Sequence, residues 1–213
     1  MGHLKQAAMG FRVHSGWAAV VAVCVDRGAP VVLARQRVHL VEVFTYEFRQ
    51  PYHTAEEMVL GQAREFITRM QAEAQRLAYR AIRELESRTQ EQGMKLTRCG
   101  LLLASGRPLP ALEKILASHA LIHTADGELF REAILHASAR CGLRDFRIRE
   151  KKLLDRAENV LRLKSAALMR RVTELGRPFG PPWSQDEKFA TLAAWLAIAS
   201  KLSSLPESAF LKP

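Results

Sequence analysis

Two histidines four residues apart, His119 and His123, are the pair in this sequence best suited to binding a metal. On a helix, side chains at positions i and i+4 lie on one face, so both imidazoles can reach the same ion. Imidazole pairs at this spacing suit zinc, and Glu128, Asp126 or His53 are candidates to complete the site. The residue after His119 is alanine, so the HExxH pattern of zinc proteases is absent. We therefore expect either a divalent-metal or acid–base site, or two histidines that only pack together, which is the commoner arrangement.

Other polar residues indicate chemistry less strongly. Ser15, with His14 or His119, has the residue types of a nucleophile and its base, but no GxSxG sequence surrounds it, and a strand serine beside a glycine usually serves packing. Asp186 and Glu187 open a predicted helix in the pattern of a capping box, in which a glutamate satisfies an early N–H group. Neither GxxxxGK[ST] nor GxGxxG occurs, so no glycine-rich phosphate loop is predicted.

Basic residues are concentrated between positions 144 and 177. The chain has 32 Lys and Arg against 22 Asp and Glu, and in this stretch eleven basic and five acidic residues leave a net charge of +6. Such a concentration can attract phosphate backbones without reading base sequence; the alternative is a solvated helix face on a basic protein. The residues expected to contact nucleic acid are Arg144, Arg147, Arg149, Lys151, Lys152, Arg170 and Arg171, with Trp183 as an exposed platform on which a base can stack.

Composition is typical of a folded globular chain. Hydrophobic residues make up 48% and charged residues 25% of the 213 positions, which excludes a disordered or collagen-like protein. No apolar run is long enough to span a membrane, and the first residues lack the apolar core of a signal peptide. Three cysteines without CxxC spacing predict buried, reduced thiols. We expect a cytoplasmic protein with no membrane partner and either no cofactor or a divalent metal.

The N-terminal part is rich in residues that favour strands. Residues 11–25 predict one long central strand, 26–30 a turn, and 31–48 one long strand or two short ones. A capping-box sequence then opens an amphipathic helix expected over 54–92 and ended by Gly93. A helix that long overhangs a small sheet, so its far end must project, bend or pack against a partner. Pairing in a homodimer through helix 54–92 is the first expectation.

The rest of the chain alternates strands and helices. Residues 101–104, ending in Ser105-Gly106, predict a buried parallel strand, and 145–153 alternate like a half-exposed or edge strand. Residues 124–128 interrupt an apolar helix, either as a break whose new N-terminus suits an anion or because Gly127 admits a neighbouring helix. Amphipathic helices are predicted over 110–141, 157–175 and 184–200.

This order of elements resembles the ribonuclease-H-like superfamily and, within it, the Holliday-junction resolvases of the RuvC kind. The stretch His14-Ser15-Gly16-Trp17-Ala18 is similar to the small and aromatic residues of that family's first hairpin. Ser118 and Gly127 resemble small residues in the helix after its fourth strand, and Asp186 lies where the family carries acidic residues near its last helix. The resemblance implies an α/β fold with a mixed β-sheet flanked by helices.

The resemblance also implies that catalytic carboxylates are missing. These nucleases use two metal ions, held by three or four carboxylates, to activate water and stabilise the leaving oxygen. The family's first Asp falls near Met9, within a segment, residues 1–25, that contains no acid, and its next Glu falls within 103–106, which also contains none. Only Asp186, with Glu187, remains, so the usual nuclease chemistry is expected to be absent.

We predict a single α/β domain spanning 1–213 with a long projecting helix over 54–92. Three alternative functions are consistent with the sequence. The first is a catalytically degenerate ribonuclease-H-like protein associated with nucleic acid. The second is a metal- or acid/base-dependent hydrolase that uses His119, His123 and Glu128. The third is a protein-interaction scaffold that binds through its long helix. If any catalysis occurs, the candidate residues are Asp186, Glu187, Glu128 and Ser15.

Overall fold

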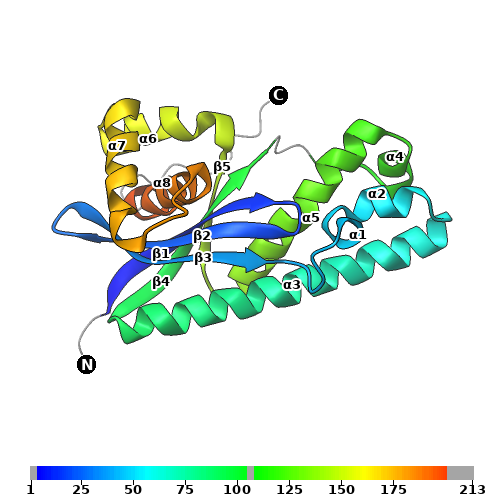
Figure 1. Ribbon diagram of the computed structural model, residues 1–213, viewed down its shortest axis with the longest axis horizontal. Coiled ribbons are helices and arrows are strands. Elements are labelled where there is room, and N and C mark those ends of the chain that lie inside the picture. The colour runs from blue at the N-terminus through cyan, green and yellow to red at the C-terminus, as the bar shows by residue number, and fades with distance from the viewer. Residues whose placement is uncertain (1–3, 105–107, 201–213) are drawn as a thin grey trace.

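The protein is built on one five-stranded mixed sheet, which a computed structural model describes together with its helices over residues 4–104 and 108–200. The strands lie in the order β3-β2-β1-β4-β5 (Figure 1). The first three form an antiparallel meander, whereas β4 runs parallel to β1 and β5 runs parallel to β4. The carboxyl ends of β1, β4 and β5 therefore meet at one end of the sheet. The strands are β1 (Lys5–His14), β2 (Trp17–Asp26), β3 (Ala29–His39), β4 (Met94–Leu103) and β5 (Arg144–Arg149).

Helices cover both faces of the sheet (Figure 1). Helix α8, with α6 and α7 packed against it, covers one face, and α3 and α5 cover the other. The α-helices are α1 (Tyr46–Arg49), α2 (Pro51–Glu56), α3 (Leu60–Glu91), α4 (Leu112–Leu116), α5 (His119–Arg140), α6 (Leu153–Leu161), α7 (Ser165–Leu175) and α8 (Gln185–Ala199); short 3-10 turns are η1 (Glu150–Lys152) and η2 (Arg177–Phe179). No described helix is long and apolar enough to cross a membrane.

The single strand predicted over 11–25 is wrong: this segment holds most of a hairpin. The chain reverses between β1 and β2 at Gly16, whose φ of 80° is easily adopted only by glycine. Apolar residues continue on both sides of the turn because β1 and β2 are central strands, so the hydrophobic pattern alone does not mark the reversal. The turn predicted over 26–30 is confirmed between β2 and β3, and the following segment forms one strand that ends at His39.

Two glycines let α8 lie directly on the sheet. Gly10 on β1 and Gly100 on β4 are partners in the parallel register. A Cβ atom at Gly10 would lie 2.0 Å from the carbonyl oxygen of Ala190, and one at Gly100 would lie 2.4 Å from that of Ala193. This close approach brings the first turn of α8 beside the end of β1.

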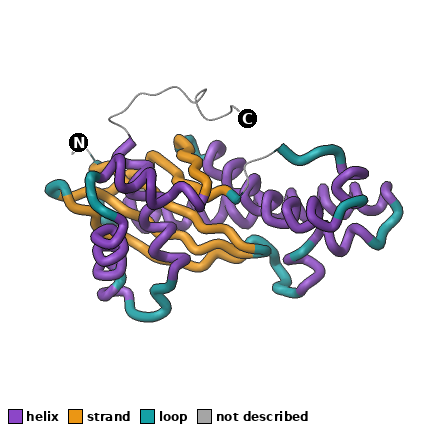
Figure 2. The backbone as a smooth tube through the Cα atoms, turned by 90° about the horizontal axis from the view of Figure 1, so that it is seen from above, coloured by secondary structure: helices purple, strands orange, loops and turns teal. Residues whose placement is uncertain are grey.

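The helix predicted over 54–92 consists of two helices. Thr54 lies inside α2, where its hydroxyl donates to the carbonyls of Glu47 and Gln50 instead of capping a helix. The long helix α3 begins at Leu60 beyond the sheet, where α2 and α5 pack against it in a helical extension that also holds α1 and α4 (Figure 2). The overhanging end thus has partners within its own chain, and pairing with a second copy stays a prediction.

The other helices also differ from their predicted limits. The helix predicted over 157–175 is divided into α6 and α7 at Arg162, which adopts a left-handed φ of 57°. Helix α5 continues without a break through 124–128, and the side chain that covers Gly127 is Arg131 of the same helix. Both explanations offered for that interruption are therefore wrong. The last helix is confirmed, and so is the edge strand β5, although it ends at Arg149 and not at residue 153, because η1 follows it. Ser105-Gly106 lie outside the described residues.

Candidate functional site

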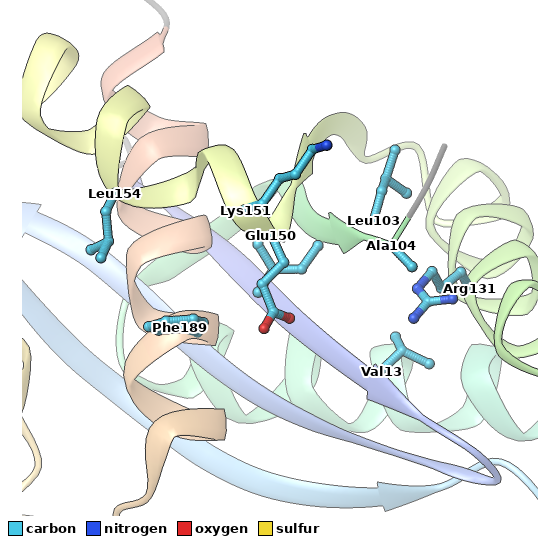
Figure 3. Close-up of a pocket in the computed structure, with 9 residues that line it drawn as sticks. Val13, Leu103, Ala104, Arg131, Glu150, Lys151, Leu154 and Phe189 are labelled. Atoms are coloured by element: carbon cyan, nitrogen blue, oxygen red, sulfur yellow. The ribbon is translucent and has the colours of Figure 1, made fainter. Parts of the chain in front are cut away.

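A pocket of about 610 Å³ opens at the carboxyl ends of the three parallel strands (Figure 3). In open α/β sheets this end is where ligands usually bind, because loops and helix termini converge there. The pocket lies between the two helical layers, since α5 supplies Arg131 on one side and α8 supplies Phe189 on the other. Its lining consists of Val13, Leu102, Leu103, Ala104, Arg131, Glu150, Lys151, Leu154 and Phe189.

Arg12 joins Glu150, which lines this pocket, to Asp186 at the start of α8. Its Nε and Nη2 donate to the two carboxylate oxygens of Glu150 at 3.0 and 2.7 Å, and its Nη1 donates to Asp186. Asp186 also bonds His14 Nε2 at 2.8 Å. Arg12 and His14 lie two positions apart on β1, so both point toward the α8 side of the sheet. We refer to Arg12, His14, Glu150 and Asp186 as the Arg12 network.

The charges of the Arg12 network stabilise one another. The hydrogen bonds and the charge of Glu150 raise the pKa of Arg12 above its ordinary value. Burial raises the pKa of Asp186, but the hydrogen bonds from His14 and Arg12 outweigh it, so this pKa lies below its ordinary value. Asp186 therefore stays ionised at neutral pH, and both Asp186 and Glu150 are already paired with the Arg12 guanidinium.

Met9, where the resemblance places the family's first acid, does not face the α8 side of the sheet. Met9 is fully buried among the residues under α3 and α5. Because side chains alternate along a strand, the α8 face of β1 is supplied by Ala8, Gly10, Arg12 and His14 instead. Position 10 has no room for a side chain beneath α8, so Arg12 is the first residue of β1 that can reach the pocket end of that face.

One of the predicted catalytic residues, Glu187, has a structural role. Glu187 accepts hydrogen bonds from the backbone N–H and the hydroxyl of Ser184, both at 2.7 Å, and this confirms the predicted capping box. Ser15 lies in the turn between β1 and β2 rather than on a strand. The neighbouring His14 binds Asp186 and stacks on Trp17 with ring centroids 4.4 Å apart. A serine–histidine pair is therefore not formed by Ser15 and His14.

The seven basic residues predicted to contact nucleic acid are all exposed, but they do not form one surface. On β5, Phe146 and Ile148 pack against the α8 layer, so Arg147 and Arg149 point to the opposite face, as their alternation predicts. Arg170 and Arg171 lie on α7, over the α8 layer. Lys151, in η1, is the member of the set that lines the pocket.

Trp183 is not the exposed platform that its neighbouring prolines suggest. Its indole Nε1 donates to the carbonyl of Val172 at 2.8 Å. Its ring lies against Gly176, where an added Cβ would be 2.2 Å from the indole, and stacks near Phe179 at 5.9 Å. Trp183 therefore fastens the loop before α8 onto α7.

A second cluster lies in the helical extension. His53 of α2 meets His119 and His123 of α5, and each offers a nitrogen within 4.8 Å of the others. Asp126, buried beneath them, accepts a hydrogen bond from His53 Nδ1 at 2.5 Å. Of the partners considered for the histidine pair, His53 and Asp126 are thus in place.

Glu128, the acid assigned to the hydrolase alternative, is not in this cluster. A helix turns by about 100° per residue, so position 128 lies about 140° around the axis from position 123. Glu128 instead pairs with Arg131 at 3.1 Å. The site proposed from His119, His123 and Glu128 is therefore not assembled in the structure.

Sequence reasoning missed Arg12, Arg131 and the role of Glu150. Two polar residues two positions apart, Arg12 and His14, in an otherwise apolar strand were the available signal, because such residues share one face. Glu150 counted only as an acid within a basic stretch. No local pattern connects it to Arg12, which is 138 positions away.

Comparison with known proteins supports the fold. No family model and no curated relative matches the sequence. Among solved structures, the chain is similar to Thermus thermophilus RuvC in complex with a Holliday junction substrate, with 11% identity and a TM-score of 0.54, over 92% of this chain and 95% of that one. A second Thermus thermophilus RuvC structure covers the same shares with 10% identity and a TM-score of 0.47. The predicted fold is confirmed: this α/β chain, a mixed sheet flanked by helices, has the ribonuclease-H-like architecture.

Proposed function

We propose that this protein binds nucleic acid at the carboxyl end of its sheet and does not cut it by two-metal chemistry. The single observation that carries this proposal is the Arg12 network. A cationic side chain bridges Glu150 and Asp186 at the end of the sheet where ligands of such folds usually bind.

The donor set at this end does not fit a pair of divalent ions. The resemblance to resolvases implies three or four carboxylates, whereas Arg12 holds Glu150 and Asp186, and Arg131 holds Glu128. A divalent ion would have to displace the guanidinium that already neutralises these carboxylates. Arg12 on β1 also brings a positive charge to the strand that carries an acid in those nucleases. The paired carboxylates at this end therefore disfavour a bound divalent cation, and Lys151 adds a positive charge to the pocket lining.

Phosphate is the anion that the surface suits. Lys151 and Arg131 line the pocket, and Arg149, which directly precedes the lining residue Glu150, is exposed at the end of β5. Across the whole chain the formal charge of +10 adds long-range attraction for a polyanion. Because the RuvC of similar fold was solved with a Holliday junction substrate, a four-way DNA junction is the first form to test.

Fluorescence anisotropy with labelled junction, duplex and single-stranded DNA tests the binding half of the proposal. We expect binding that persists in EDTA and weakens steeply with salt, because each phosphate contact contributes about −0.9 to the slope of log K against log salt. An affinity that does not change with salt concentration, or no binding to any form of DNA or RNA, would contradict the proposal.

Incubation of the junction with Mg²⁺ or Mn²⁺ tests the other half. We expect the DNA to remain intact at protein concentrations that saturate it. Cleavage by the wild-type protein that disappears in Asp186→Asn would show that the Arg12 network opens to hold metal, and the non-cutting half of the proposal would then be wrong.

A further inference from the structure

A second site, unrelated to the sheet, is built where α2 meets the start of α5. The two helices lie side by side in the extension beyond the sheet (Figures 1 and 2). His119 and His123 are exposed on successive turns of α5, with Nε2 atoms 3.0 Å apart. His53 closes the group from α2, with ring centroids 4.4 Å from His123 and 5.4 Å from His119.

These distances are close to those of a tetrahedral metal site. With Zn–N bonds of 2.0–2.1 Å, two ligand nitrogens lie about 3.3 Å apart. The two Nε2 atoms of α5 already have nearly that separation, and the three ligand nitrogens all lie within 4.8 Å of one another. His119 and His123 are exposed, so their imidazoles are free to turn toward the partly buried ring of His53.

Asp126 gives the group a feature that packed histidines do not need. Its carboxylate is buried and accepts from His53 Nδ1 at 2.5 Å and from the backbone N–H of Tyr52 at 2.7 Å. The bond to Nδ1 fixes the His53 tautomer, so that Nε2 keeps its lone pair free. Metal-binding histidines usually donate their second nitrogen to a carboxylate in this manner, which orients the ring and makes it a stronger ligand.

We propose that His53, His119 and His123 bind one zinc ion, with Asp126 as the positioning residue behind His53. Three imidazoles with no carboxylate ligand suit zinc and its transition-metal neighbours and do not suit Mg²⁺ or Ca²⁺. The fourth position of the tetrahedron faces solvent, because His119 and His123 are exposed. It is therefore open to water or to a ligand from another molecule.

Zinc affinity of the untagged protein, measured by competition with a chromophoric chelator, tests this site. We expect one zinc ion per chain and a visible absorption band when Co²⁺ replaces zinc. His119→Ala and His123→Ala should each weaken binding more than Asp126→Asn, for which the expected loss is about 10–100-fold. The matched control is His136→Ala, because His136 is exposed on the same helix and belongs to no such cluster among the described residues; the zinc affinity of this variant should equal that of the wild type.

Because His119 and His123 are exposed, we expect the alanine variants to fold like the wild type. Circular dichroism spectra of the variants check this. If the wild type binds no stoichiometric zinc, the proposal is wrong, and His53–Asp126 is only a tie between two helices. Equal loss in His136→Ala and His123→Ala would also overturn it, because binding would then be adventitious. None of these outcomes depends on DNA binding at the other end of the molecule.

Discussion

Arg12 serves two carboxylates from distant parts of the chain with one side chain. A guanidinium is a planar fork with five N–H donors, so it can grip both oxygens of Glu150 and still reach Asp186. The side chains of Arg12 and Asp186 are about one-fifth exposed, so water screens their attraction only partly. The network therefore ties β1, η1 and α8 together at the pocket.

Replacing Arg12 alone should destabilise the protein more than replacing Arg12 and Glu150 together. Arg12→Met leaves the half-buried Glu150 without its partner and Asp186 with His14 alone, and we expect the free energy of unfolding to fall by about 1–3 kcal/mol. Arg12→Met combined with Glu150→Gln should recover part of that loss. Urea denaturation of the four members of this double-mutant cycle measures the coupling. Simple additivity of the two substitutions would contradict a direct pairing.

Asp186 should make stability depend on acid pH. Its pKa is depressed in the folded protein, so its contribution is complete above the unfolded value of about 3.9 and is lost as pH falls through the folded value. Asp186→Asn should therefore cost about 1–2 kcal/mol at pH 7, and the gap from wild type should narrow as the pH falls below about 3.9 and Asp186 becomes protonated in the folded protein. Thermal melts from pH 7 to pH 2.5 measure this. A gap that stays constant with pH would show that charge is not its cause.

At the scale of elements, the position of the Arg12 network depends on how closely α8 approaches the sheet. Gly100→Ala would place a methyl group 2.4 Å from the Ala193 carbonyl oxygen, a backbone atom that cannot move by itself. We expect this substitution to cost at least about 1–3 kcal/mol, the usual range for overpacking. Gly61→Ala is the matched control, because a Cβ there meets nothing within 4 Å and alanine favours the helix. Equal stability of the two variants in urea would contradict the close packing.

Zinc should couple two elements, α2 and α5. If His53 and the two α5 histidines share an ion, zinc at a hundred times its dissociation constant stabilises the folded state by about 2.7 kcal/mol. Calorimetric melts of untagged protein with and without zinc measure this stabilisation. His123→Ala should abolish the shift, whereas His136→Ala should keep it. A shift retained in His123→Ala would place the ion elsewhere.

Local pattern predicts most elements of this fold, and it fails where tertiary packing decides. The alternation of Phe146 and Ile148 with arginines is a property of the strand itself, so β5 was predictable. The ends of helices were less so: Arg162 takes a left-handed conformation that ends α6 without glycine or proline. The hairpin at Gly16 was hidden because both of its strands are buried on two faces.

The two candidate sites also differ in whether local pattern or tertiary packing brings their residues together. His119 and His123 are four positions apart on one helix, so their proximity is visible in the sequence. The Arg12 network joins positions separated by 138 and 174 residues, and only the path of the chain brings them together. Charge counting found the basic stretch, but it could not show that the sheet divides that stretch between two faces.

For the molecule as a whole, the question is whether its +10 charge acts as a diffuse field or through the pocket. Lys151 lines the pocket, while Lys95 is equally exposed near the amino end of β4, about 26 Å from that strand's carboxyl end. Lys151→Ala and Lys95→Ala remove the same charge, so a diffuse field predicts equal weakening of DNA binding. Contact at the pocket predicts that only Lys151→Ala lowers the affinity, with a salt slope reduced by about 1. Anisotropy titrations of both variants at several salt concentrations separate the two cases, and equal losses would rule out the pocket as the place where phosphate binds.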